Sequence, residues 1–376
     1  MYLGMVYAIF SIGILGFIVW SWLLASLLSD MEILNNFAIC WNSLVLFSTL
    51  NGKNLHSYTQ SAGNLSLNSF NAIKQSASET TRETSFNFVA FRIYYNTLLN
   101  KDSKHLSDNW LSWFIGFVEG DGAIQTYANR TKLRLVITQK ESAILYHIHN
   151  SLEIGKVKHY PQGLKLNKSG NGNKNDFYRF TVDKLSHILL LALLFNGNLA
   201  MTHRINQLSL WITVLNLKFK TISIHSKPVK ITLEDAWLSG FTDAEGCFNV
   251  SVTLNSRYKL GSVIKMRYLL DQTDNIILVK IKDLFGFGKV TLRSQTENVY
   301  RYTTTGFNSM SNVLTYFKLF PLKSQKKNSL DKWANIHNMV MSKVHLTEEG
   351  SNEIKILSKQ ININNSKTNK TGLAKP

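Results

Sequence analysis

Residues 111–124 read LSWFIGFVEGDGAI, a short apolar segment that ends on an acid flanked by two glycines. Small residues recur in it at intervals of four, at Ser112, Gly116 and Gly120. Residues four apart lie on one face of an α-helix, so the segment predicts a helix with a narrow face that a second helix can approach closely. This face ends beside Asp121, and Gly122 is expected to break the helix there.

The same arrangement returns in residues 233–250, LEDAWLSGFTDAEGCFNV. Here the small residues, the acid and the glycine after it are Ala236, Gly240, Ala244, Glu245 and Gly246. A single copy would more often be a helix-packing feature, but a second copy with an acid in the same place favours an active site. If the two faces pack together, Asp121 and Glu245 meet. Adjacent carboxylates repel unless they are protonated or share a cation, so the simplest prediction is a hard divalent metal ion bound between them.

Both segments resemble the LAGLIDADG motif of homing endonucleases and group I intron maturases. The resemblance covers Phe114–Gly122 (FIGFVEGDG) and Leu238–Gly246 (LSGFTDAEG), and it places the metal-binding acid at Asp121 and at Glu245. It implies an α+β fold of two pseudo-symmetric αββαββα half-domains that form a saddle of two antiparallel sheets. It also implies a monomer with internal pseudo-twofold symmetry, Mg²⁺ as cofactor with Mn²⁺ as a substitute, and cleavage of both DNA strands.

The spacing of residues after each acid supports a duplication. In each half a Gln and a Gly lie 16 positions apart, and an Arg and a Trp lie 32 positions apart. These pairs are Gln139–Gly155, Gln272–Gly288, Arg179–Trp211 and Arg301–Trp333. Alternation and helical periodicity predict a helix, two strands, a helix, two strands and a helix in each half. The strands are expected at 124–127, 132–138, 155–160, 176–182, 247–254, 262–269, 289–294 and 299–304.

The resemblance also assigns four accessory residues around the acids. Gln139 and Gln272 resemble the polar residue of the family's active site, which orders water. Arg204 and Lys326 each lie seven positions before the repeated Trp, where the family has a basic residue beside the scissile phosphate. Lys326 matches that pattern well and Arg204 matches by register only; an ordinary phosphate contact or a solvated side chain is the alternative. A cation there would stabilise the charge of the transition state.

Two further acids and two cysteines need an interpretation. Glu119 and Asp243 lie inside the motifs and are interpreted as structural or solvent-facing groups at the motif ends. Cys40 and Cys247 are too few for a disulfide framework or a structural zinc site. The cysteine count therefore excludes small disulfide-rich and zinc-finger folds.

The net charge of +18, from 42 Lys and Arg against 24 Asp and Glu, indicates nucleic acid as the first candidate partner and an anionic membrane surface as the second. Alternation places polar and basic side chains on the outer faces of the strands, a pattern typical of β-ribbon readout in the major groove of double-stranded DNA. The predicted contacts are Gln125, Tyr127, Arg130, Lys132, Arg134, Lys156, Lys158, Asn249, Ser251, Thr253, Arg257, Lys265, Arg267, Lys289 and Arg293.

Residues 1–29 contain no charged side chain and are long and apolar enough to cross a bilayer. Through about Trp20 and Ser21 they resemble an internal transmembrane stretch of cytochrome c oxidase subunit I, which indicates an upstream exon read in frame into an intron. A genuine membrane anchor is the alternative. The exon interpretation places the protein in the mitochondrial matrix, with contact to the inner membrane open before processing. The predicted parts are 1–29 exon-derived, 30–105 linker of uncertain structure, 106–222 and 223–345 half-domains, and 346–376 polar tail.

Two functions follow from these observations. The first is a site-specific, Mg-dependent double-strand DNA endonuclease that acts on the intronless cytochrome oxidase subunit I exon junction and promotes intron mobility. The second is a maturase that binds its own group I intron RNA and assists splicing, and the two roles can coexist in one protein. Retention of both acids favours the nuclease. No small-molecule substrate is expected.

Overall fold

The computed structural model describes residues 86–129, 131–161, 165–166, 172–173, 176–219 and 222–361. The predicted exon-derived segment, most of the predicted linker and Arg130 lie outside the described residues. Within the described ranges, no helix has both the length and the hydrophobicity that a membrane crossing requires.

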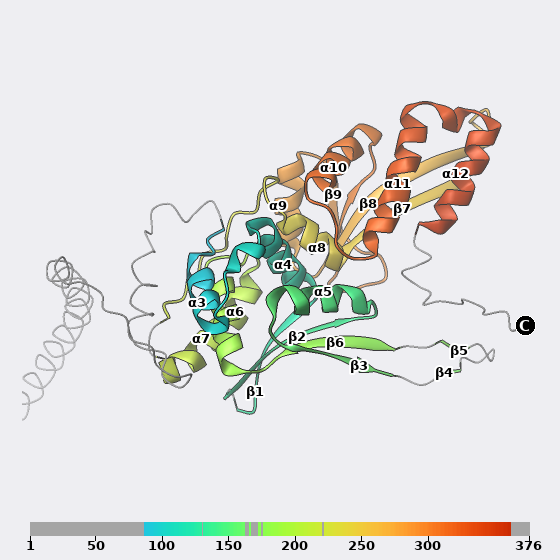
Figure 1. The fold of residues 1–376 in the computed structure, drawn as a ribbon. Helices are drawn as coiled ribbons and strands as arrows, with labels where there is room; N and C mark the ends of the chain where they lie inside the picture. The colour runs from blue at the N-terminus through green and yellow to red at the C-terminus, as the bar shows by residue number, and fades with distance from the viewer. Residues whose placement is uncertain are drawn as a thin grey trace, which may run out of the picture. The chain divides into compact units, whose positions relative to one another are not determined.

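The first half contains a four-stranded antiparallel sheet in the order β1-β2-β6-β3. Its elements are α4 (Asp108–Asp121), β1 (Gly122–Tyr127), β2 (Lys132–Gln139), α5 (Ser142–Leu152), β3 (Lys156–Tyr160), β6 (Phe177–Val182), α6 (Leu185–Phe195) and α7 (Thr202–Phe219). A short hairpin of β4 (Lys165–Leu166) and β5 (Gly172–Asn173) lies in the connection between β3 and β6. Figure 1 shows this half from teal to light green.

The second half repeats this topology, with strand order β7-β8-β10-β9. Its elements are α8 (Trp237–Glu245), β7 (Gly246–Leu254), β8 (Ser262–Gln272), α9 (Asn275–Phe285), β9 (Lys289–Leu292), β10 (Tyr300–Thr304), α10 (Phe307–Leu319) and α11 (Lys326–Met341). The predicted α+β class and all eight predicted strands are confirmed, with shifts of a few residues at their ends.

Each half closes with two helices instead of the single helix expected. In the first half, a turn containing Gly197 separates α6 from α7, and its φ of 82° is a left-handed conformation that favours glycine. In the second half, Pro321 follows α10 and cannot donate the backbone hydrogen bond that would continue the helix. Gly197 and Pro321 thus mark both helix breaks in the sequence, although one closing helix was predicted for each half.

Helices α4 and α8 pack against each other through their small residues (Figure 1). The Oγ of Ser112 accepts a hydrogen bond from the backbone N–H of Ala236 at 3.2 Å. A Cβ on Gly116 would overlap the carbonyl oxygen of Trp237, and a Cβ on Gly240 would overlap that of Trp113. The backbones are thus in direct contact, as the spacing of the small residues predicted.

The folded part begins earlier than predicted. Residues 89–99 form helix α3 (Val89–Leu99), which packs against α6 with Phe91 and Tyr95 fully buried. Just before this helix, the backbone N–H and C=O of Asn87 both bond the side chain of Asn198, at 2.8 and 2.7 Å. The prediction of a linker up to residue 105 is therefore wrong from residue 86 onward, because α6 is apolar all round and needs a second covering helix.

The folded part also ends later than predicted. Helix α12 (Glu348–Gln360) packs against α11 and β7 with Ile354 fully buried. Thr347 caps this helix, since its Oγ1 accepts a hydrogen bond from the N–H of Gly350 at 3.1 Å. The prediction of a polar tail from residue 346 is corrected for residues 346–361, where a narrow apolar stripe within a polar sequence is enough to fix the helix.

Candidate active site

The two motif acids lie at the junction of a helix and a strand. Asp121 is the last residue of α4 and Glu245 is the last residue of α8. The glycines that follow, Gly122 and Gly246, have φ of −79° and −81°, so glycine is not required there for a left-handed conformation. A Cβ on either glycine would lie 2.6 Å from a carbonyl oxygen of the preceding helical turn. Glycine thus lets the chain turn directly from the helix into the strand beside the acid.

The two carboxyl groups influence each other. Burial, and after it the charge of Asp121, raises the pKa of Glu245 to about 7. Burial also raises the pKa of Asp121, against the opposing effects of the Lys326 charge and the hydrogen bond from Gln139. A divalent cation between the halves would favour the ionised form of both acids, so the pair suits a hard metal ion. Among the described residues, no group of three or more His, Cys, Asp or Glu side chains that could hold a metal ion is found.

Each acid accepts a hydrogen bond from a glutamine of its own half. Gln139, the last residue of β2, donates through Nε2 to Oδ2 of Asp121. Gln272, the last residue of β8, donates through Nε2 to Oε1 of Glu245 at 3.2 Å. Both glutamines predicted from the sequence therefore touch the acids, which places them where they can orient a carboxylate.

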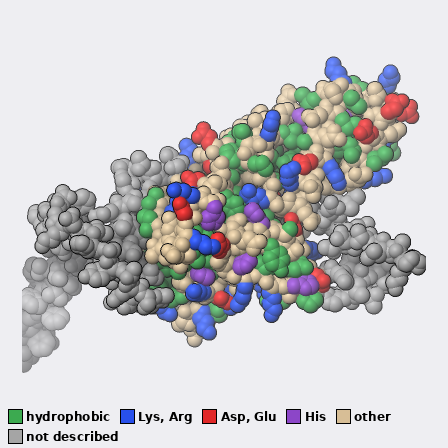
Figure 2. Space-filling view, viewed as in Figure 1, with side chains coloured by type: hydrophobic (Ala, Val, Ile, Leu, Met, Phe, Trp, Pro, Cys, Tyr) green, Lys and Arg blue, Asp and Glu red, His purple; other side chains and the backbone are tan. Residues whose placement is uncertain are grey.

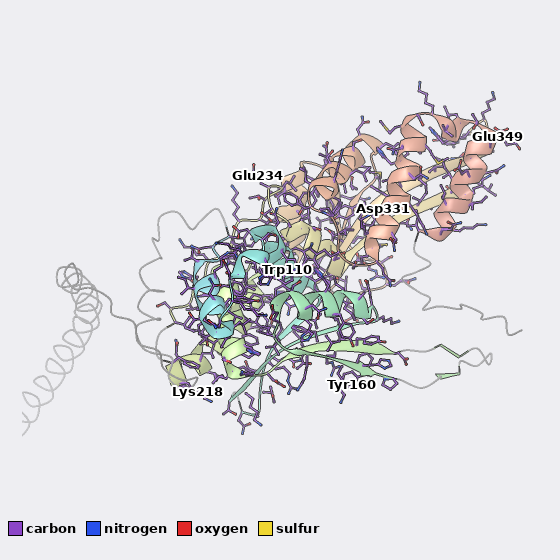
Figure 3. All side chains as sticks on the ribbon, viewed as in Figure 1. Trp110, Tyr160, Lys218, Glu234, Asp331 and Glu349 are labelled. Atoms are coloured by element: carbon purple, nitrogen blue, oxygen red, sulfur yellow. The ribbon has the colours of Figure 1, made fainter. Side chains whose placement is uncertain are left out.

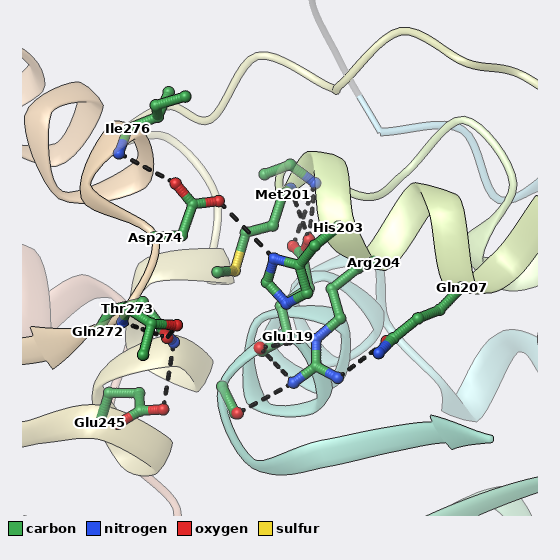
Figure 4. A network of polar contacts seen from close by, with 12 residues as sticks. Glu119, Met201, His203, Arg204, Gln207, Glu245, Gln272, Thr273, Asp274 and Ile276 are labelled. Carbon is green, nitrogen blue, oxygen red and sulfur yellow. Dashed lines mark hydrogen bonds and ion pairs between the residues drawn. The ribbon is translucent and has the colours of Figure 1, made fainter. Parts of the chain in front are cut away.

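Each half also brings a cation to the end of its motif helix. Arg204 donates to the carbonyl oxygen of Glu119 through Nε and Nη2, at 3.1 and 2.9 Å, and to that of Gly120 at 3.2 Å (Figure 4). Lys326 donates through Nζ to the carbonyl oxygens of Thr242 and Ala244, at 3.2 and 2.6 Å. Carbonyls in the last turn of a helix carry partial negative charge, which suits a cation.

Arg204 and Lys326 occupy equivalent positions in the two halves, although only Lys326 matched the family pattern well. Burial lowers the pKa of both Lys326 and Arg204, and the charges of Asp121 and Glu245 oppose this in each case. All six predicted catalytic residues therefore gather around one centre, and Arg204 is the one for which the sequence gave the weakest indication.

The neighbouring motif acids, Glu119 and Asp243, hold the two halves together. Glu119 accepts hydrogen bonds from two backbone N–H groups before α7 and from the indole Nε1 of Trp237, the last at 2.6 Å. Asp243 accepts from two backbone N–H groups before α11 and from the indole Nε1 of Trp113 at 2.8 Å. Both acids are buried, so the structural interpretation is confirmed and the solvent-facing alternative is wrong.

The outer face of the first sheet gathers polar and basic side chains. Residues opposite each other in an antiparallel pair share a face, and the register places Gln125 opposite Arg134 and Tyr127 opposite Lys132. Around a hollow of about 460 Å³ lie Gln125, Arg134, Val136, Lys156, Lys158, Tyr160, Arg179, Thr181 and Asp183. Tyr160, Arg179, Thr181 and Asp183 were not predicted, although alternation from the buried Phe180 indicates the direction of Arg179 and Thr181.

The outer face of the second sheet is arranged in the same way. Asn249 lies opposite Arg267, and Ser251 lies opposite Lys265. The remaining predicted residues of this half are Thr253 at the end of β7, Arg257 in the turn after it, and Lys289 and Arg293 on or beside β9. No member of the predicted set is buried within the described part of the chain.

One ion-pair group on the second sheet was missed from the sequence. Arg301 donates through Nε and Nη2 to the two carboxylate oxygens of Asp271, both at 2.6 Å. Arg293 lies 3.3 Å from the same carboxylate. Alternation predicts which face these residues occupy, but it does not predict which of them pair.

Comparisons with known proteins agree with this architecture. Residues 238–337 match the family model of the LAGLIDADG endonucleases. The probable intron-encoded endonuclease 4 of Neurospora crassa is 31% identical over 287 residues, which are 75% of this chain and 50% of that protein. The intron-encoded RNA maturase bI4 of Saccharomyces cerevisiae is 25% identical over 285 residues, 71% of this chain and 40% of that protein. This chain thus spans half of the length of these curated relatives or less.

A solved structure shares the fold. I-SmaMI bound to an uncleaved DNA target in the presence of calcium ions has a TM-score of 0.52 with this chain at 17% identity. The match covers 68% of this chain and 98% of that chain, and at this identity it shows the fold alone. The duplicated motif helices, the family model and these relatives agree, and residues 238–337 form a domain of the LAGLIDADG endonuclease family.

Proposed function

We propose that this chain is a site-specific endonuclease that hydrolyses both strands of double-stranded DNA. The observation that carries the proposal is the acid pair of Asp121 and Glu245, one from each half, with a buried cation beside each motif helix. These two carboxylates would hold Mg²⁺, with Mn²⁺ as a substitute. When bound, the ion would activate water and stabilise charge on the phosphate and on the leaving oxygen.

The residues around the acids have their own parts in this proposal. Gln139 and Gln272 orient the carboxylates through their amide N–H groups and would order water near them. Lys326 and Arg204 carry positive charge at fixed places close to both acids. Charge that is positioned before the reaction stabilises a transition state without reorganisation, so these cations would lower the barrier for a phosphate that gains negative charge.

The two outer sheet faces would bind the DNA. Arg and Lys side chains there suit guanine or phosphate, and Gln and Asn suit adenine. The hollow around Arg134, Lys156 and Lys158 supports such a face on the first half. Figure 2 shows Lys and Arg side chains spread over the visible surface, which fits the net charge of +18 and predicts binding that weakens steeply with salt.

The proposed target is the intronless exon junction of the cytochrome oxidase subunit I gene, and the proposed location is the mitochondrion. Support comes from the resemblance of the first 21 residues to an internal stretch of that subunit. The duplicated acid pair supports action as a monomer, because one chain supplies both halves of the site.

The test is incubation of the full-length chain with Mg²⁺ and two duplexes. One spans the junction that contains the codons for residues 18–21 without the intron, and the other carries the intron. We expect double-strand cleavage of the first duplex alone, and none with the Asp121→Asn, Glu245→Gln double variant. If the wild-type chain leaves the intronless duplex intact while it binds intron RNA tightly, the endonuclease proposal fails.

An RNA maturase is the second candidate function, and the similarity to maturase bI4 favours it. The same basic faces could bind a folded intron RNA. The discriminating measurement is splicing with the double variant of Asp121 and Glu245. Splicing that persists in the absence of DNA cleavage would separate the two activities, and splicing that the wild-type chain does not promote would remove the maturase.

A further inference from the structure

Two acids outside the catalytic set connect the halves at equivalent positions. Glu141 and Asp274, which we name the bridging acids, each lie two residues after an active-site glutamine, Gln139 or Gln272. Each occupies the N-cap position of the helix that follows, α5 for Glu141 and α9 for Asp274. They therefore lie in the short connections that directly follow the strands ending on the catalytic glutamines.

Glu141 reaches the opposite half through a bifurcated hydrogen bond. Its Oε1 and Oε2 both accept from the backbone N–H of Gln325, at 3.1 and 2.9 Å. Gln325 is the N-cap residue of α11 and directly precedes Lys326. The side chain of Glu141 makes no capping hydrogen bond to its own helix α5. This bifurcated bond thus holds the start of the helix that carries the cation of the second half.

Asp274 makes the equivalent connection in the other direction. Its Oδ1 accepts from the N–H of Ile276 at 3.0 Å and caps α9. Its Oδ2 lies 3.7 Å from Nδ1 of His203, in the first turn of α7 and directly before Arg204. Figure 4 shows Asp274 between His203 of the first half and Ile276 of the second. The residue directly before each cation is therefore contacted by an acid of the opposite half: Gln325 by Glu141 and His203 by Asp274.

We propose that the bridging acids are positioning residues, each of which sets the cation of the opposite half against the acid pair. Lys326 then depends on Glu141 of the first half, and Arg204 depends on Asp274 of the second. The proposal rests on the proposed function, because its consequence is that each bridging acid controls cleavage of one DNA strand. Glu141 accepts a backbone hydrogen bond at 2.9 Å, whereas Asp274 lies 3.7 Å from the side chain of a half-exposed histidine, so Glu141 has the larger effect.

The experiment is single-turnover cleavage of a duplex that carries a different label on each strand, with the full-length chain. Glu141→Ala removes the bifurcated bond to Gln325, and Asp274→Asn keeps an oxygen to cap α9 but loses the charge next to His203. We expect Glu141→Ala to slow one strand about tenfold and Asp274→Asn to slow the opposite strand about threefold, at unchanged DNA affinity. Glu141→Gln, which keeps one acceptor oxygen in place, restores part of the rate.

Matched controls remove a carboxylate from α11, whose N-cap residue is contacted by Glu141, and from α9, which Asp274 caps. Asp331→Ala breaks an exposed pair with Lys327 on α11, and Asp283→Ala breaks an exposed pair with Lys282 on α9. Figure 3 marks Asp331 on α11. Both controls are expected to cut the two strands at wild-type rates.

Hydrogen exchange in the absence of DNA tests the contact independently of activity. The peptide that contains Gln325 and Lys326 is expected to lose protection in Glu141→Ala and to keep it in Asp331→Ala. Unchanged protection in Glu141→Ala, equal slowing of both strands, or slowing of the same strand by both bridging variants overturns the positioning proposal while the endonuclease stands. A wild-type chain that cuts no DNA overturns the proposed function and the positioning role together.

Discussion

Replacement of Glu245 by Gln is expected to stabilise the metal-free protein at neutral and alkaline pH. The folded-state pKa of Glu245 is about 7, raised from 4.5 by burial and by the charge of Asp121. An acid with a raised pKa favours the folded state when protonated. The stability that it supports is therefore fully present below pH 4.5 and is lost as the pH rises to 7. Glutamine keeps the shape of the protonated acid without the titration.

The magnitude follows from the interval between 4.5 and about 7. At about 1.4 kcal/mol per pH unit, ionisation of Glu245 costs the fold up to about 3 kcal/mol by pH 8. Glu245→Gln should thus raise the Tm at pH 8 in EDTA by up to about 10 °C, and leave it unchanged at pH 4.5. Mg²⁺ should raise the Tm of the wild-type chain and have a smaller effect on the variant, which lacks one of the two carboxylates.

The assay is differential scanning calorimetry of both proteins from pH 4.5 to 8, with EDTA or Mg²⁺. Glu119→Gln is the control. Burial also raises the pKa of Glu119 to about 7, but its oxygens accept hydrogen bonds from two backbone N–H groups and the Trp237 indole. A glutamine amide would face one of these donors, so this variant should be destabilised at every pH by about 1–3 kcal/mol. A Tm of Glu245→Gln that falls below the wild-type value at pH 8 in EDTA would refute the reasoning.

Three further outcomes are expected. Gly240→Ala should lower the free energy of unfolding in urea by about 1–3 kcal/mol, because its Cβ would overlap the Trp113 carbonyl, and an unchanged urea midpoint would contradict this packing. Arg179→Ala should weaken DNA binding and reduce the slope of log K against log salt by about one in fluorescence anisotropy, if Arg179 contacts a phosphate. Lys326→Met should slow single-turnover cleavage about 100-fold at unchanged affinity, with partial recovery in Lys326→Arg; equal loss of affinity would make Lys326 a binding residue instead.

The duplication made most of the fold predictable. Alternation located the strands, and the resemblance to the LAGLIDADG motif placed Gln139 and Gln272 beside the acids, where both side chains lie in the structure. Helix α3 was not predicted because its apolar residues are buried by packing against α6, which is apolar all round. The local sequence does not show that contact. The role of Arg204 also depended on tertiary contacts, since only the fold brings its guanidinium to the carbonyls of Glu119 and Gly120.

Pairing between polar side chains was the least predictable part of the site. The sequence places Asp271 and Arg301 on strands, and alternation gives their face, but their mutual bonds depend on strand register. The same holds for the bridging acids, which contact residues about 70 and 184 positions away in the chain. Such contacts arise from the packing of one half on the other, for which a local pattern carries no signal.

The crossed bonds of Trp113 with Asp243 and of Trp237 with Glu119 have a consequence for recombining half-domains. Each half supplies an indole donor and a buried carboxylate, and each carboxylate is completed by the other half. A chimera that joins one of these halves to a foreign half leaves a buried acid or an indole N–H without its hydrogen bond, unless the foreign half places an indole donor and a carboxylate within hydrogen-bond distance. Since the first half carries Glu119 and the second carries Asp243, the two tryptophan–acid pairs are not interchangeable. The residues at the tryptophan and acid positions of a foreign half therefore predict whether a chimera can form both hydrogen bonds.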